Sequence, residues 1–94
     1  MNIRWSREAK RQLAAAHDFV AADHLAAAGE VLDCILKSVR QLADFPESGR
    51  TGRVKNTREL VIVGTPYIVA YRIKGSDLQI LALLHGKRRW PKSF

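Results

Sequence analysis

Residues 67–85, with the sequence Tyr-Ile-Val-Ala-Tyr-Arg-Ile-Lys-Gly-Ser-Asp-Leu-Gln-Ile-Leu-Ala-Leu-Leu-His, decide the fold. Side chains alternate with a period of two over residues 67–73, which predicts a β-strand rich in aromatic and β-branched residues. Gly75-Ser76-Asp77 predicts a turn, and residues 78–84 predict the next strand. Because this last strand is apolar on both faces, we expect it to be central in its sheet or covered on both sides.

One more strand is predicted before this hairpin. Residues 59–63 are rich in β-branched residues, and Gly64-Thr65-Pro66 ends the run. Consecutive strands with short connections form hairpins, so the three strands predict an antiparallel meander.

The N-terminal half predicts a short strand followed by two helices. Residues 2–5 alternate as a strand does, and Ser6 is the expected N-cap of a helix that reaches about Ala22. Asp23 caps a second helix, or the two helices merge through a slight break. The second helix ends before Pro46. Its apolar stripe has a 3-4-3-4-3 spacing: Leu25, Ala28, Leu32, Ile35, Val39 and Leu42.

These elements predict one α+β domain over residues 1–94. Their order is β-α-α-β-β-β, with a helical hairpin on one face of the sheet. A chain of 94 residues fits one domain, and 47 % apolar residues are enough for a core without disulfides or metals. The N-terminus has no apolar segment typical of a signal peptide, and no run is long enough to span a membrane. We therefore expect a cytoplasmic protein.

The positive charge is concentrated in the C-terminal half. The net charge of the chain is +7. Residues 1–49 hold six basic and seven acidic residues, net −1, whereas residues 50–94 hold ten basic and two acidic residues, net +8. Most of these basic residues fall in segments 50–58 and 87–92. Such clustering indicates an anionic partner, and the alternative is a general contribution to solubility.

Few residues suit a metal or cofactor site. The single cysteine, Cys34, excludes an internal disulfide or a thiolate zinc site, and we expect it to be a partly buried, inert thiol. His17 and His24 are seven residues apart but lack a third ligand. The two glycines of segment 49–53 lack the spacing of a phosphate-binding loop. No metal or cofactor is predicted.

The C-terminal residues offer acid–base chemistry. His85 ends the last strand, and Lys87, Arg88 and Arg89 follow it. A histidine beside arginines can move a proton on a ribose hydroxyl while the arginines stabilise the charged phosphate, which is metal-free ribonuclease chemistry. Alternatively, His85 is a hydrogen-bonded strand end. Trp90 either stacks on a base or partner side chain or closes one end of the core.

The whole chain resembles the RelE/ParE superfamily of toxins from bacterial type II toxin–antitoxin modules. The resemblance lies in Phe45-Pro46-Glu47-Ser48-Gly49-Arg50, Thr57-Arg58-Glu59-Leu60-Val61, Thr65-Pro66-Tyr67-Ile68-Val69-Ala70-Tyr71-Arg72 and Ile80-Leu81-Ala82-Leu83-Leu84-His85-Gly86-Lys87-Arg88-Arg89-Trp90. Together these segments are similar to the ParE-like branch. The resemblance implies a toxin neutralised by a cognate ParD- or RelB-like antitoxin, with operator DNA bound only through the antitoxin.

Two activities are implied by this resemblance. ParE-like members inhibit DNA gyrase, and RelE-like members cleave mRNA in the ribosomal A site. Arg88 matches the RelE-type arginine, but Phe94 stands where a RelE-type tyrosine would carry a hydroxyl. We therefore expect gyrase inhibition, with plasmid stabilisation as the associated role. The alternative is a ribosome-dependent mRNA endonuclease with His85 and Arg88 as catalytic residues. A toxin-fold remnant that only binds its partner is a third interpretation.

Two sets of residues are predicted to make contacts. The expected target-binding set consists of Arg50, Arg53, Arg58, Lys87, Arg88, Arg89 and Trp90. The expected antitoxin-binding set lies on apolar positions of the first helix and the last strand: Leu13, Val20, Leu81 and Leu83.

Overall fold

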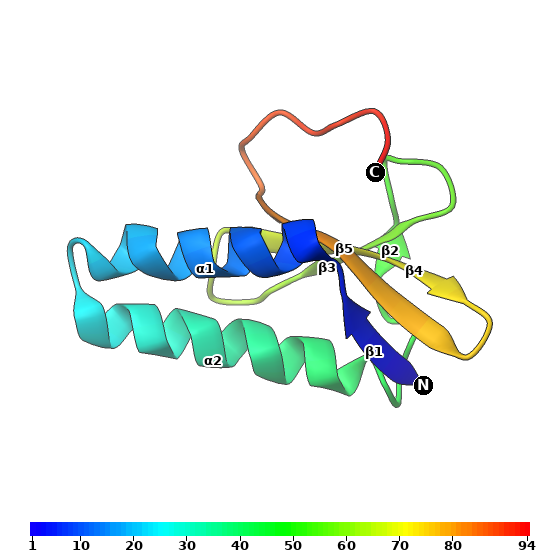
Figure 1. Cartoon of the computed structure of the whole chain (residues 1–94), viewed down its shortest axis with the longest axis horizontal. Helices are drawn as coiled ribbons and strands as arrows, with labels where there is room; N and C mark the ends of the chain where they lie inside the picture. The colour runs from blue at the N-terminus through cyan, green and yellow to red at the C-terminus, as the bar shows by residue number, and fades with distance from the viewer.

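The computed structural model describes residues 1–94 as a two-helix layer packed against a five-stranded sheet (Figure 1). The elements are β1 (Asn2–Trp5), α1 (Arg7–Ala21), α2 (Leu25–Gln41), β2 (Arg50–Thr51), β3 (Arg58–Val61), β4 (Tyr67–Lys74) and β5 (Asp77–His85). The strand order is β1-β5-β4-β3-β2. The predicted α+β architecture and meander are confirmed, and β2 is a strand that the sequence pattern did not predict.

Strand β5 is an interior strand between β1 and β4, as its two apolar faces predicted. It pairs antiparallel with β4 along its whole length and parallel with β1, where Asn2–Trp5 lie opposite Asp77–Ile80. The β4–β5 turn has two residues, and Gly75 adopts a φ of 61° that favours glycine. The sheet therefore joins the two ends of the chain.

Side-chain caps begin both helices. The Ser6 hydroxyl accepts a hydrogen bond from the Ala9 amide at 3.0 Å and donates one to the Leu81 carbonyl at 3.1 Å. The prediction that Asp23 caps the second helix is wrong, because Nδ1 of His24 accepts the Ala27 amide at 3.0 Å. His24 is the residue with extended backbone angles, so its side chain can reach back to the first turn.

The core lies between the helices and one face of the sheet. Its largest fully buried side chains come from α2, the segments next to α2 and β3, and the two longest strands: Ile35, Val39, Leu42, Ile62, Val69, Tyr71, Leu78 and Ile80. Leu25, expected in the apolar stripe, is exposed at the start of α2. Cys34, expected to be partly buried, is also exposed, with its sulfur 3.9 Å from the Val63 carbonyl. No helix is long and apolar enough to cross a membrane.

The opposite face of the sheet is partly covered. Ile68, Ala70 and Ala82 alternate with the core positions and are nevertheless buried. The cover on this side is the segment after β2, which includes buried Val54, and the C-terminal tail, residues 86–94, which arches back toward that segment (Figure 1). This second face of the sheet holds Glu59 and Arg50.

Candidate functional site

A buried carboxylate organises the basic residues on the face of the sheet away from the helices. The Glu59 side chain is only 1 % exposed. Its Oε1 accepts from Arg50 Nη2 at 3.0 Å and Nε at 3.3 Å, and its Oε2 accepts the Arg53 backbone amide at 2.7 Å. Nε of Arg53 lies 3.5 Å from Oε1. Both carboxylate oxygens are therefore in use, and two guanidinium groups compensate the buried charge.

Strand register and loop closure bring these groups together. Arg50 of β2 lies directly opposite Glu59 of β3, so the two side chains share a face. The Gly52 amide donates to the Thr57 carbonyl at 2.8 Å and closes the 52–57 loop. This closure returns Arg53 to the same carboxylate. The side chains of Arg50 and Arg53 stay about half exposed, at 54 % and 45 %, and are thus accessible to a partner.

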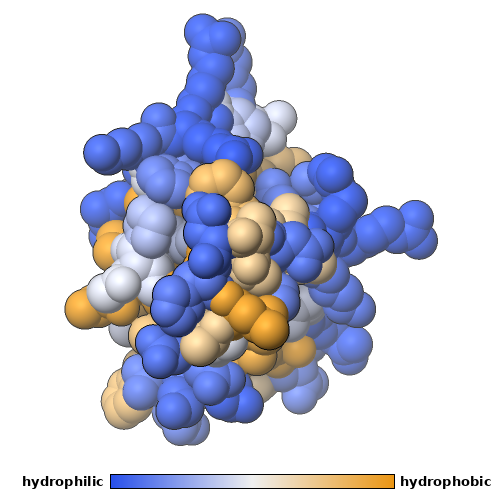
Figure 2. Space-filling view, turned by 90° about the vertical axis from the view of Figure 1, so that its left-hand side faces the viewer, coloured by the Kyte–Doolittle hydropathy of each residue, from blue (hydrophilic) through white to orange (hydrophobic).

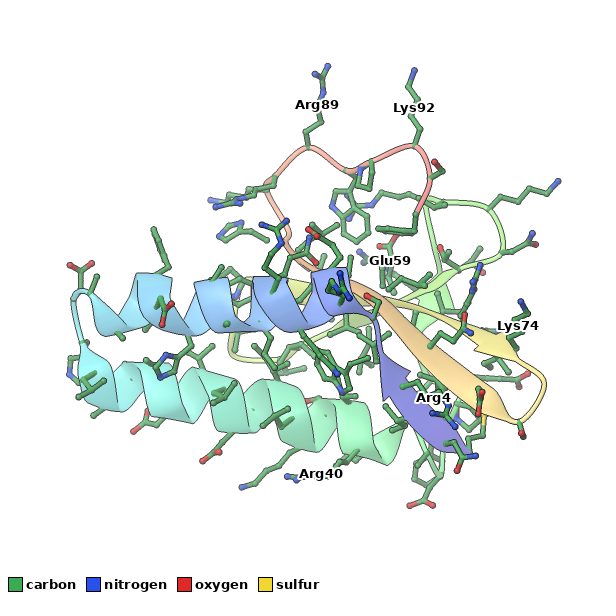
Figure 3. All side chains as sticks on the ribbon, in the orientation of Figure 1. Arg4, Arg40, Glu59, Lys74, Arg89 and Lys92 are labelled. Carbon is green, nitrogen blue, oxygen red and sulfur yellow. The ribbon has the colours of Figure 1, made fainter.

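Trp90 lies against this cluster. The Arg53 guanidinium carbon is 4.0 Å from the centre of the Trp90 ring, a cation–π contact. The indole N–H of Trp90 is buried and has no hydrogen-bond partner. One face of the indole is thus already covered by a residue of the chain itself. Arg89 and Lys92, by contrast, point from the tail into solvent, whereas Glu59 lies beneath the tail (Figure 3).

Arg58, one of the residues predicted to bind the target, braces the segment after α2. Its Nη1 donates to the carbonyls of Gly49 at 2.8 Å and Glu47 at 3.2 Å. The buried Tyr71 hydroxyl accepts the Gly49 amide at 2.9 Å and donates to the Pro46 carbonyl at 2.8 Å. Burial raises the pKa of Tyr71 above its ordinary value, opposed by the Gly49 amide and the Arg58 charge. This network holds the chain just before the Glu59 cluster.

A separate groove of about 400 Å³ runs between α1 and the end of β5. Its floor is mainly apolar, and its rim is basic. The lining residues are Gln12, Ala15, Ala16, Phe19, Tyr67, Leu83, Leu84, His85, Lys87 and Arg88. Figure 2 looks onto the end of the molecule where α1 and α2 join, and there apolar patches lie among hydrophilic side chains. The predicted basic cluster 87–90 is thereby divided: Lys87 and Arg88 line the groove, while Arg89 and Trp90 lie over the sheet.

His85 has a defined orientation in this groove. Its Nδ1 accepts the Lys87 backbone amide at 3.1 Å, and its ring meets Tyr67 edge to face at 5.8 Å between centroids. An Nδ1 that accepts must be unprotonated, so in the neutral ring the proton is on Nε2. In this tautomer Nε2 can donate a hydrogen bond, but the nitrogen that can accept a proton is Nδ1, so a general-base role requires Nδ1 to release the Lys87 amide.

The predicted antitoxin-binding residues occupy different environments. Leu13, Val20 and Leu81 are half-buried, and Leu83 is only 3 % exposed and belongs to the core while touching the groove. The larger exposed apolar surface comes from residues that sequence analysis missed, among them Phe19 at 71 % exposure. A helical stripe shows which residues are apolar but not where the sheet stops covering them.

Glu59 was also missed as a site residue. Only two acidic residues, Glu59 and Asp77, occur in the basic half of the chain, and Glu59 falls within a strand. A carboxylate in an apolar strand needs cationic partners when buried. This was the signal that pointed to an organised arginine cluster.

No group of three or more His, Cys, Asp or Glu side chains is arranged to hold a metal ion.

Comparisons with known proteins match nearly the whole chain. A family model described as "ParE toxin of type II toxin-antitoxin system, parDE" matches residues 3–90. A curated protein of Sinorhizobium fredii (strain NBRC 101917 / NGR234), described as "Putative toxin Y4kP", is 42 % identical over 90 residues, covering 96 % of this chain and 93 % of that protein. A structure titled "Chromosomal ParDE TA system from P. aeruginosa" superposes with a TM-score of 0.83 at 26 % identity, covering 90 % of this chain and 95 % of that one.

Proposed function

The chain belongs to the ParE toxin family of type II toxin–antitoxin systems, and from this premise we propose that it arrests growth by inhibiting DNA gyrase. The observation that carries this proposal is the surface organised by Glu59, in which Arg50, Arg53 and Trp90 lie together. We name this set, with the neighbouring Arg89, the target surface. Fixed cations beside an aromatic ring are typical of the centre of a protein interface.

The geometry of the alternative nuclease site supports it less well. A ribonuclease needs a base for the ribose 2′-hydroxyl and an acid for the leaving group. Nδ1 of His85 is occupied by the Lys87 amide, and Phe94 cannot donate a proton. The remaining candidate, Arg88, supplies charge stabilisation alone. We therefore place gyrase before the ribosome as the target.

Two assays on the purified toxin test this assignment. We expect it to block supercoiling by purified gyrase and to leave mRNA intact in a reconstituted translation reaction. His85→Ala should inhibit gyrase as the wild type does, because His85 lies outside the target surface. Ribosome-dependent mRNA cleavage that disappears in His85→Ala, with supercoiling unaffected by the wild type, would replace the proposal by the nuclease.

The toxin–antitoxin module implies an antitoxin partner, and we place this partner in the groove between α1 and β5. The floor of the groove offers Phe19, which is largely exposed, and the rim offers Lys87 and Arg88. An amphipathic acidic segment matches both the apolar floor and the basic rim. Beyond Trp5 the outer edge of β5 receives one backbone bond, from the Ser6 amide to the Ile80 carbonyl at 2.9 Å. After that it is bonded only to side chains: the Ser6 hydroxyl donates to the Leu81 carbonyl, and the Gln12 amide oxygen accepts the Leu83 amide. The antitoxin segment can extend along this edge.

Phe19→Ala is expected to weaken antitoxin binding about thirtyfold, the effect of losing an aromatic anchor worth about 2 kcal/mol. Phe45→Ala is the matched control, because Phe45 is exposed to a similar extent, 67 %, but lies after α2 and away from the groove. Titration calorimetry with the cognate antitoxin measures both variants. Equal affinities for the two variants would exclude the groove as the antitoxin site.

A further inference from the structure

We propose that Glu59 is the positioning residue of the target surface: it orients Arg53, and Arg53 in turn holds Trp90 and the C-terminal tail in place. The inference rests on the proposed function of that surface. In this role Glu59 does more than neutralise the arginine charges. It positions the tail indirectly, through Arg53.

The first step is that Glu59 itself is rigid. It is paired on one side with Arg50 of β2 and on the other with Ala70 of β4, and its side chain is almost fully buried. Both oxygens accept hydrogen bonds, so the carboxylate has one available orientation. A group held in this way can serve as a fixed reference for the neighbouring 52–57 loop.

The second step is that Glu59 holds Arg53 at two points. Oε2 accepts the backbone amide at 2.7 Å, and Oε1 lies 3.5 Å from Nε of the side chain. Binding at both ends of the side chain restricts the plane of the guanidinium. That plane is what the Trp90 ring contacts at 4.0 Å, and a lysine has no equivalent plane.

The third step is that the tail has few other tethers. The amides of Lys87 and Arg88 bond to His85, and residues 89–94 make no hydrogen bond. Even the indole N–H of Trp90 is without a partner. The cation–π contact between Arg53 and Trp90 is therefore the polar contact that holds residues 89–94 in place. Loss of the Glu59 charge should release Arg53 and, with it, Trp90.

Trp90 fluorescence tests this chain of contacts directly. The chain has two tryptophans, so Trp5→Phe leaves Trp90 as the reporter. In that background we expect Glu59→Gln and Arg53→Lys each to make Trp90 at least about threefold more accessible to acrylamide quenching, as loss of a cation–π contact predicts. Asp77→Asn is the matched control: it removes the other acidic charge of this half, which pairs with Arg4 at 3.3 Å, and should leave quenching unchanged.

The functional readout uses the same variants without Trp5→Phe. Glu59→Gln and Arg53→Lys should raise the toxin concentration for half-maximal inhibition about three- to thirtyfold. Asp77→Asn should inhibit as the wild type does, and the affinity for the antitoxin should be unchanged in all three variants. A folded Glu59→Gln variant with unaltered Trp90 quenching would overturn the proposal, as would a released Trp90 with full inhibition. If Glu59→Gln does not fold, Arg53→Lys decides alone.

Failure of the proposed target would appear differently. A wild-type toxin without effect on gyrase refutes the target but not the positioning role, because the quenching of Trp90 needs no target. Growth arrest by overproduction then replaces the supercoiling assay as the functional comparison between Glu59→Gln and Asp77→Asn.

Discussion

Gly49→Ala is expected to lower the free energy of unfolding by about 3 kcal/mol, the upper range for overpacking a filled site. A Cβ at Gly49 would lie 2.6 Å from the Tyr71 hydroxyl oxygen, 2.7 Å from its ring carbon Cε1 and 3.0 Å from the Glu59 carbonyl oxygen. Tyr71 is fully buried and cannot move aside. The substitution also displaces the Gly49 amide from that hydroxyl, leaving buried polar groups unpaired.

Urea unfolding followed by circular dichroism measures this change. Gly29→Ala is the control, since Gly29 lies inside α2 with no atom within 4 Å of the added Cβ. Alanine is the better helix former, so this variant should be more stable by about 0.5–1 kcal/mol. The two glycine substitutions are thus expected to change the free energy of unfolding in opposite directions. A Gly49→Ala protein as stable as the wild type would show that the 46–49 segment is not fixed by Tyr71.

Combined replacement of Arg89 and Trp90 by alanine is expected to weaken toxicity about 100-fold, corresponding to the loss of two interface anchors worth roughly 2.7 kcal/mol together. Arg89 points freely into solvent (Figure 3). Trp90 stacks on the half-exposed Arg53. Neither residue lines the antitoxin groove. Antitoxin affinity should therefore change less than about threefold, even as inhibition of the target is lost.

Growth arrest on induction and antitoxin binding, measured side by side, test this separation. Arg40→Ala combined with Phe45→Ala is the matched control, because it also removes one arginine and one exposed aromatic residue. Arg40 projects from α2 on the side opposite Arg89 (Figure 3). The control should remain fully toxic. Undiminished arrest by the folded Arg89/Trp90 double variant would move the target surface elsewhere on the molecule.

Periodicity predicted both helices and every strand except β2, but not all of the pairings between strands. Alternation over residues 67–85 identified β4, β5 and their turn because both strands are long and apolar. The alternation of the four residues of β1 predicts a strand. Nothing in these residues selects a parallel pairing with β5, whose partner residues lie about 75 positions later in the chain. Strand β2 was missed because two residues are too few to show a period.

The site was predictable in composition but not in geometry. Clustered arginines and Trp90 were visible as a basic segment and an aromatic residue. Their division into a target surface and a groove depends on where the chain turns after His85, which the sequence pattern does not specify. Arg58 illustrates the same limit, since its charge predicted a ligand contact while its position opposite Tyr71 places it on backbone carbonyls.

The position of β5 between β1 and β4 has a consequence for synthesis. Strands β1 and β4 both pair with residues 77–85, so neither the parallel nor the long antiparallel ladder can form before that segment emerges from the ribosome. A nascent chain interrupted earlier can form the helical hairpin and the pairings among β2, β3 and β4, but it lacks the strand that joins them to β1 and the tail that carries Trp90. A chain truncated before β5 should therefore be non-toxic, because the toxin can become active only after its last strand has been synthesised.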